Sequence, residues 1–210
     1  MSEIILVRHG ETEWNIGGIF RGRADIDLNG VGNRQARLLA EYLGDSKIDA
    51  ICSSPLKRAL RTAEIVASRH KLKVEIAPDV IDLDFGEWQG LTVQEVENKY
   101  KALYAEWVEN PHKVKMPGGE SLNDVRRRTT GVVNDIISRY KGTVILVSHR
   151  VVSKVMICAL LGLDNSYFWN IRQDVAGITT FVYENERFIL IGHNDTSHLK
   201  SIHKALPGDF

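Results

Sequence analysis

This 210-residue sequence has few cysteines, no excess of charge of one sign and no long apolar run, and each of these absences excludes a class of protein. It has only two cysteines, Cys52 and Cys158, both inside apolar runs, which predicts buried, reduced thiols rather than the alternative of a disulfide between them. The 27 basic and 27 acidic residues cancel, so no overall charge favours nucleic acid as a partner. No apolar run approaches the ~20 residues of a membrane-spanning helix, and no targeting segment precedes the first predicted strand. We therefore expect a cytoplasmic protein that binds neither membranes nor nucleic acid.

Strand-like and helical patterns alternate along the chain. Runs of β-branched residues and leucine at 4–7, 48–52 and 143–148 are typical of strands buried on both faces. Asn29 is expected to cap a helix, and Ser54 with Pro55 to begin another. The apolar face of the first helix is expected to contain Val31, Leu38, Leu39, Tyr42 and Leu43. This alternation predicts an α/β fold with a mostly parallel, doubly wound sheet flanked by helices.

The middle of the chain is predicted to be helical. Capping boxes at 92–95 and 121–124 each precede an amphipathic pattern, and the first of these patterns predicts one helix over 93–107. The connecting segment 110–120 is rich in proline, glycine and lysine, so we expect a mobile loop there. Together, residues 92–140 are expected to form a helical lobe, or lid, over the active site.

The last predicted element is a hairpin. Residues 177–194 alternate in polarity and turn at Asn185, which predicts two antiparallel strands added to the sheet. The sequence shows no internal repeat and no interdomain linker, so residues 1–210 are expected to form one domain.

Two of the predicted strands end in histidine. The strand at 4–7 is followed by Arg8, His9 and Gly10, and the strand at 143–148 by His149. Ligands of doubly wound sheets bind at the carboxyl ends of the strands, because the loops there open into a crevice. If these two strands are neighbours, His9 and His149 face each other.

A pair of histidines at such an edge fits chemistry on a phosphoryl group. A neutral imidazole can attack phosphorus, and the negative charge that develops on the phosphoryl oxygens needs fixed cationic donors. Arg8 adjoins His9, and Arg58 is predicted to lie in the first turn of a helix, where free backbone N–H groups also attract an anion. The arginine fork matches two phosphate oxygens better than lysine does.

Hydrolysis of a phosphoester also needs an acid that protonates the leaving alkoxide. Asp82, Asp84 and Glu87 lie close together, and because crowded carboxylates repel, one of them is expected to hold a proton near neutral pH. A metal site is the weaker alternative, because no two histidines have helical ligand spacing. Ser148 is not flanked by the glycines of a hydrolase nucleophile.

Taken as a set, the motifs resemble one family. LVRHGETEWN, FRGRADIDLNGVG, SSPLKRALRTAE, DFGEWQG, PGGES and VSHR follow in the order typical of the histidine phosphatase superfamily, which contains cofactor-dependent phosphoglycerate mutases and many phosphatases. The resemblance spans nearly the whole chain. It implies a mostly parallel sheet, no metal or other cofactor, and a covalent phosphohistidine intermediate. It also implies that His9 is the nucleophile and that Arg8, Arg58 and His149 surround the phosphoryl group.

Other positions match the family's substrate contacts or depart from its pattern. Asn15, Arg21 and Gly22 match positions that contact substrate. Asp82 occupies the position of the acid, where the family usually has the longer glutamate, so the other two acids of the segment stay open as alternatives. Arg21 stands where a neutral residue is usual, which suggests that its guanidinium binds a substrate anion.

The resemblance also narrows the activity. The chain is shorter than the mutases, which usually carry an insertion in the central lobe, and this favours water as the phosphoryl acceptor. WVENPHKVKMPGGESL, MICALLGLDNSYFW and DTSHL are similar to metal-independent phosphoserine phosphatases. Phe85, however, stands where those enzymes are expected to bind the substrate carboxylate with a histidine, and this phenylalanine is shared with broad-specificity and α-ribazole phosphatases.

The predicted function is therefore metal-independent hydrolysis of a small phosphorylated metabolite, with phosphoserine as a candidate. Phosphoglycerate mutase activity, α-ribazole phosphatase activity and non-catalytic phosphate binding are the alternatives. A homodimer is compatible with these features, and the sequence does not set the oligomeric state.

Overall fold

The computed structural model describes residues 1–202. These residues contain one six-stranded sheet. Its six strands are β1 Ser2–Arg8, β2 Ala50–Ser53, β3 Val74–Ile76, β4 Thr143–Ser148, β5 Ile178–Glu184 and β6 Arg187–Asp195. They lie in the order β3-β2-β4-β1-β5-β6, with the first four parallel and β5 and β6 antiparallel to their neighbours. The predicted α/β class and the C-terminal hairpin are confirmed. The short edge strand β3 was not expected.

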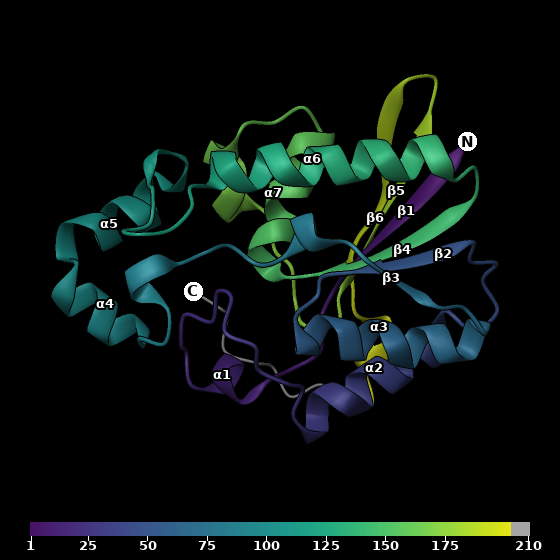
Figure 1. The fold of residues 1–210 in the computed structure, drawn as a ribbon, viewed down its shortest axis with the longest axis horizontal. Coiled ribbons are helices and arrows are strands. Elements are labelled where there is room, and N and C mark those ends of the chain that lie inside the picture. The colour runs from purple at the N-terminus through teal and green to yellow at the C-terminus, as the bar shows by residue number, and fades with distance from the viewer. Residues whose placement is uncertain (203–210) are drawn as a thin grey trace.

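Helices cover both faces of the sheet (Figure 1). They are α1 Glu13–Ile16, α2 Gly30–Tyr42, α3 Lys57–His70, α4 Val93–Lys99, α5 Lys101–Glu109, α6 Leu122–Arg139 and α7 Arg150–Leu160. The pair α2 and α3 lies on one face and the pair α6 and α7 on the other, while α4 and α5 project at one side (Figure 1). Successive side chains of β1 point to opposite faces, so Ile5 and Val7 join the core against α2 and α3, and Ile4 and Leu6 the other core.

Helix α2 is capped as predicted, and its buried face agrees with the predicted one only in part. The Asn29 side chain accepts a hydrogen bond from the Gly32 backbone, at 2.8 Å. Val31 and Tyr42, which were expected in the core, are 45% and 51% exposed, whereas Gln35 is buried and accepts from the Glu11 backbone. Leu39 and Leu43 are buried as predicted. The rest of the buried face is made mainly of small residues, which the hydrophobic pattern did not include. Helix α3 begins at Lys57, three residues beyond the predicted Ser54 start.

The predicted helix over 93–107 is two helices. Both capping boxes form, but the backbone leaves the helical conformation at Tyr100, with φ −123° and ψ 38°. The Tyr100 hydroxyl donates to Glu87, and its ring packs on Trp88. The segment 110–120 is a loop, but it is packed rather than open, because Val114 and Met116 are each only 2% exposed.

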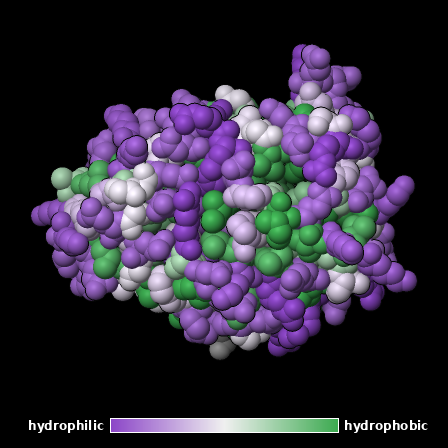
Figure 2. Space-filling model, in the orientation of Figure 1, coloured by the Kyte–Doolittle hydropathy of each residue, from purple (hydrophilic) through white to green (hydrophobic). Residues whose placement is uncertain are grey.

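The cysteine and hairpin predictions also agree with the structure. Cys52 and Cys158 are both buried and free. Residues Asn185 and Glu186 turn the β5–β6 hairpin with φ values of 49° and 60°. The face shown in Figure 2 is largely hydrophilic, with hydrophobic side chains gathered near its centre, between α6 and α3. Within residues 1–202, every helix falls short of the length and apolar character that a membrane crossing requires.

Candidate active site

The two strand-end histidines face each other. Strands β1 and β4 are parallel neighbours, with Arg8 paired to Ser148, and His9 and His149 follow them directly. The His9 backbone N–H donates to the Ser148 carbonyl, which aligns the two strand ends. Their ring centroids are 5.2 Å apart, and both residues are almost fully buried. The predicted juxtaposition of the two rings is confirmed.

One ring nitrogen of His9 is left unprotonated. Its Nδ1 lies 2.6 Å from the Gly10 carbonyl oxygen, and because a carbonyl only accepts, Nδ1 carries the proton and Nε2 keeps its lone pair. Burial holds the pKa of His9 well below its usual value, and the nearby guanidiniums of Arg58, Arg8 and Arg21 lower it further. At neutral pH the ring is therefore uncharged.

Each ring nitrogen of His149 lies close to a polar side chain. Its Nε2 lies 2.7 Å from the Ser54 hydroxyl oxygen, and its Nδ1 lies 3.7 Å from a carboxylate oxygen of Asp82. Burial lowers the pKa of His149 well below the usual value, with further contributions from Arg58 and His9. Ser54 follows β2 at the same carboxyl edge, so its position at a strand end was the signal that could have found it.

Two fixed arginines flank the histidines. The Arg8 Nη1 donates to the Gln173 carbonyl at 2.7 Å. The fully buried Arg58 donates to the Gly22 and Ala24 carbonyls, each at 2.7 Å, and to Asp82 at 3.1 Å. Its Nε has no partner among the described residues. The loop carbonyl that orients Arg8 had no signal in the sequence, because any residue type can supply it.

Only one of the three clustered acids reaches the histidines. Asp82 is 5% exposed and contacts both Arg58 and His149. The Asp84 carboxylate accepts from the Gly86 backbone and pairs with Arg23, at 3.3 Å, and Glu87 is exposed and accepts from the Tyr100 hydroxyl. The expectation that these carboxylates crowd one another is wrong, because the backbone turn after Asp82 sends the other two away.

Two of the three predicted substrate contacts, Arg21 and Gly22, have recorded links to this centre. Arg21 is 8% exposed and, with Asp82 and Phe85, lines a small hollow. Gly22 has a φ of 50° and supplies the carbonyl that Arg58 binds. Asn15 accepts from the backbone and hydroxyl of Thr12, and its amide nitrogen is buried with no partner among the described residues.

The lack of a side chain at Gly10 allows its backbone to lie close to that of Gly32. A Cβ at Gly10 would lie 2.6 Å from the Gly32 carbonyl oxygen, so any side chain there would displace α2 or the loop that carries His9. The close neighbour of Gly10 is therefore Gly32, at the start of α2.

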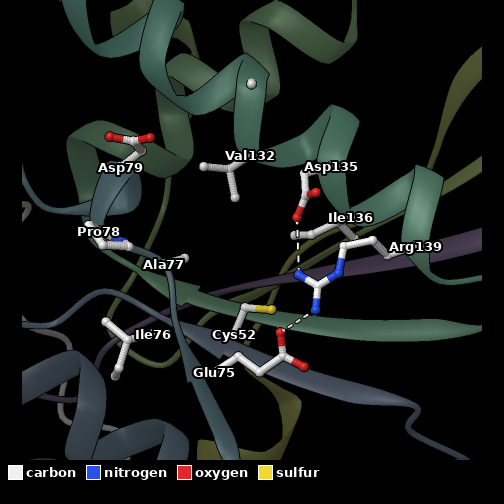
Figure 3. Close-up of a pocket in the computed structure, with 11 residues that line it drawn as sticks. Cys52, Glu75, Ile76, Ala77, Pro78, Asp79, Val132, Asp135, Ile136 and Arg139 are labelled. Carbon is white, nitrogen blue, oxygen red and sulfur yellow. Dashed lines mark hydrogen bonds and ion pairs between the residues drawn. The ribbon is translucent and has the colours of Figure 1, made fainter.

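One cavity of the protein is lined by none of the histidines. It has a volume of about 270 Å³ and opens between β3 and α6 (Figure 3). Arg139 pairs there with Glu75 and Asp135, and burial raises the pKa of the Cys52 thiol to about 11, so this thiol stays protonated. No histidine lines this cavity. Within residues 1–202, moreover, no group of three His, Cys, Asp or Glu side chains is placed to hold a metal ion.

Comparison with known proteins identifies the family to which this chain belongs. The model of the histidine phosphatase superfamily (branch 1) matches residues 4–196. Phosphoserine phosphatase 1 of Hydrogenobacter thermophilus is 42% identical over 98% of this chain and 100% of its own length.

Two solved structures share the fold over their whole length. Bacillus stearothermophilus YhfR, 27% identical, covers 95% of this chain with a TM-score of 0.91. A phosphoserine phosphatase from Entamoeba histolytica, solved as an H9A variant in complex with phosphoserine, is 30% identical, also covers 95% and has a TM-score of 0.82. Each of the two matches covers 100% of the known chain. The chain belongs to the histidine phosphatase superfamily.

Proposed function

We propose that this phosphatase of small phosphorylated metabolites acts through a phosphohistidine on His9 and that phosphoserine is among its substrates. The observation that carries the mechanism is the pair of buried rings 5.2 Å apart, with an uncharged His9 beside Arg8 and Arg58. An uncharged imidazole flanked by fixed cations suits attack on a phosphoester dianion, because the cations attract the substrate and keep the nucleophile unprotonated.

In the first step, His9 Nε2 attacks phosphorus and the bond from phosphorus to the leaving oxygen breaks. Arg8, Arg58 and His149 stabilise the charge on the phosphoryl oxygens, and the unpartnered Nε of Arg58 is a donor that an oxygen can occupy. Asp82 acts in this proposal as the general acid and gives a proton to the leaving alkoxide. The products of this step are the alcohol and phosphohistidine.

In the second step, water attacks phosphorus and the P–N bond breaks. The Asp82 carboxylate takes a proton from that water, which returns both Asp82 and His9 to their starting states. Asp82 is assigned this role because it alone of the three clustered acids contacts His149, at 3.7 Å. Asn15, Arg21 and Gly22 are proposed to bind the substrate around this centre.

Phosphoserine as a substrate is supported by the relatives. The Hydrogenobacter protein, 42% identical, and the Entamoeba protein, 30% identical, are both phosphoserine phosphatases. Inorganic phosphate released from phosphoserine, 3-phosphoglycerate and α-ribazole phosphate would rank the candidates. A bisphosphate-dependent conversion of 3-phosphoglycerate without phosphate release would instead favour the mutase alternative.

Residues 92–140 are proposed to form the helical lobe over the active site. Trp107 of α5 packs edge-on against Phe85, which lines the hollow beside Asp82, with ring centroids 6.3 Å apart. We further propose one domain, a cytoplasmic location, which the buried free cysteines favour, and a homodimer. Light scattering after gel filtration tests the last of these.

The mechanism is tested by trapping the intermediate. Protein quenched during turnover of a ³²P-labelled phosphoester should carry an acid-labile label on the His9 peptide, and His9→Ala should carry none and release no phosphate. Turnover by wild-type protein without that label, or turnover by His9→Ala, would refute the mechanism. We also expect chelators to leave the rate unchanged, and a rate restored only by added metal would contradict metal independence.

A further inference from the structure

Asp82, the proposed general acid, lies on an irregular segment of the chain. The short 3-10 helix Pro78–Val80 precedes it, and residues 81–85 have no regular conformation. A strand end is held in register by its sheet, whereas a loop segment is held by the groups that bond to its backbone. The position of Asp82 therefore depends on contacts from other elements.

The side chain of Arg128, in α6, reaches the backbone of this segment. Its Nη1 donates to the Asp79 carbonyl at 2.6 Å and to the Ile81 carbonyl at 2.7 Å, and its Nη2 donates to the Asp82 carbonyl at 3.2 Å. The Nε and Nη2 also donate to the two carboxylate oxygens of Glu120, at 3.1 and 3.0 Å. These bonds use all five N–H groups of the guanidinium, so its orientation is fixed.

Glu120 binds the other end of the segment and is the counterion of Arg128. It accepts from the Asp84 backbone N–H at 3.1 Å and pairs with Arg23 at 3.2 Å. The side chains of Arg128 and Glu120 are 14% and 18% exposed, and their two-bond geometry is more rigid than that of an ordinary surface pair. The segment is thus bound on both sides of the Asp82 side chain.

The Asp82 carboxylate has little freedom to compensate for a shift of its backbone. One of its oxygens accepts from the Leu83 backbone at 3.0 Å, and the other accepts from Arg58 at 3.1 Å and lies 3.7 Å from His149 Nδ1. A single methylene joins this carboxylate to the backbone, so a displaced backbone displaces the carboxylate. A displacement of about 1 Å at a reacting group can lower the rate about 100-fold.

We propose that Arg128 is a positioning residue for the general acid: through the carbonyls of residues 79, 81 and 82 it holds Asp82 where its carboxyl protonates the leaving alkoxide. The inference rests on the proposed function and adds to it a residue of α6 that is 46 positions from Asp82 in the chain. Arg128 acts through Asp82 and needs no contact with the substrate.

The dependence of the rate on the leaving group tests this role. The departing alkoxide of phosphoserine needs a proton and the 4-nitrophenolate of 4-nitrophenyl phosphate does not, so the ratio of their kcat/KM values reports on the acid. Arg128→Met should lower the ratio of phosphoserine to 4-nitrophenyl phosphate by about 10- to 100-fold. A loss of folded protein would lower both rates equally and leave the ratio unchanged.

A second variant keeps the test decisive if Arg128→Met does not fold. Arg128→Lys retains the positive charge but has three N–H donors for five acceptors, so it should lower the same ratio by about threefold or more. Arg127→Met is the matched control on the same helix, because the Arg127 side chain is 79% exposed and pairs with Asp124. It should leave the ratio within about twofold of the wild-type value.

A double variant shows whether Arg128 acts through Asp82. In an Asp82→Asn background, Arg128→Met should change the ratio by no more than about twofold, because the group that it positions is no longer an acid. A further tenfold decrease there would overturn the positioning role, and so would an unchanged ratio in both Arg128 variants when Asp82→Asn alone lowers it. Either result would leave the proposed function standing. If Asp82→Asn leaves the ratio unchanged, or if His9 takes no label during turnover, the proposed mechanism fails and the positioning role fails with it.

Discussion

At the scale of single residues, the site depends on cations that act on two groups at once. In the proposed mechanism Arg58, Arg8 and Arg21 attract a phosphate dianion, and their positive charges add to burial in holding the pKa of His9 well below its usual value. A nucleophilic imidazole must be unprotonated, so the arginines proposed to bind substrate would also keep the proposed nucleophile reactive. The Gly10 carbonyl completes this arrangement, because it fixes the proton on Nδ1.

The two histidines should differ when each is removed. We expect His149→Ala to lower kcat about 10²- to 10³-fold without abolishing turnover, because His149 stabilises charge and forms no bond to phosphorus. Rapid-quench measurement of phosphohistidine formation checks this. His70→Ala, at the far end of α3, is the control and should leave the rate within about twofold. A loss as complete as that of His9→Ala would contradict a purely stabilising role.

The acid role of Asp82 predicts a dependence on the leaving group. Asp82→Asn should slow hydrolysis of an alkyl phosphate such as phosphoserine by about 10²- to 10⁴-fold, and 4-nitrophenyl phosphate much less, because a nitrophenolate leaves without a proton. Steady-state rates on both esters measure the difference. Asp84→Asn, whose carboxylate is bound to Arg23 and the Gly86 backbone, should affect the two esters equally. Equal losses in Asp82→Asn would move the acid role to another carboxylate.

At the scale of elements, the site is built where β1, β2 and β4 end at one edge of the sheet. His9, Ser54 and His149 come from the ends of these three strands, and parallel pairing aligns those ends. The first turn of α3 adds Arg58. The site is thus carried by the termini of regular elements, whose backbone positions the sheet holds in register, rather than by long loops.

The β5–β6 turn gives a prediction at this scale. Glu186 has a φ of 60°, which an L-residue adopts at a cost and glycine does not. Glu186→Gly should therefore stabilise the protein by roughly 0.5–1 kcal/mol, measured as a higher midpoint of urea denaturation. Glu184→Gly, two positions earlier in β5, is the control and should destabilise by a similar amount. A lower midpoint for Glu186→Gly would contradict the turn conformation.

At the scale of the whole molecule, the buried histidines couple folding to pH. Both His9 and His149 have pKa values well below 6.5 in the folded state, while in the unfolded chain they titrate near the usual value. Below pH 6.5 the unfolded chain therefore binds more protons, and stability falls as the pH falls toward the lowered values. Each histidine adds up to about 1.4 kcal/mol per pH unit to this slope.

Denaturant unfolding between pH 7.5 and 5 tests this linkage. In His149→Asn the free energy of unfolding should fall less steeply with decreasing pH than in the wild type, by up to about 1.4 kcal/mol per unit. The exposed-surface variant Arg172→Gln should keep the wild-type slope. Equal slopes for His149→Asn and wild type would show that His149 does not stay neutral in the folded protein.

Much of the fold could be predicted because its signals are local. The strand runs at 4–7 and 143–148, the Asn29 cap and the hairpin turn at Asn185 all depend on neighbouring residues. The errors have tertiary causes. The helix over 93–107 breaks at Tyr100 because that side chain bonds to Glu87, a residue that the periodicity of the helix does not include.

By itself, the sequence determined the α/β class, the strand ends that carry His9 and His149, and the order of motifs that indicates the family, because these depend on residue type and spacing along the chain. Only the tertiary structure decided that β1 and β4 are neighbours, that Asp82 contacts His149, and that Arg128 bonds to the backbone of Asp82. These contacts are between residues far apart in the chain. They depend on packing across the sheet and between helices, and a local sequence pattern does not predict such packing.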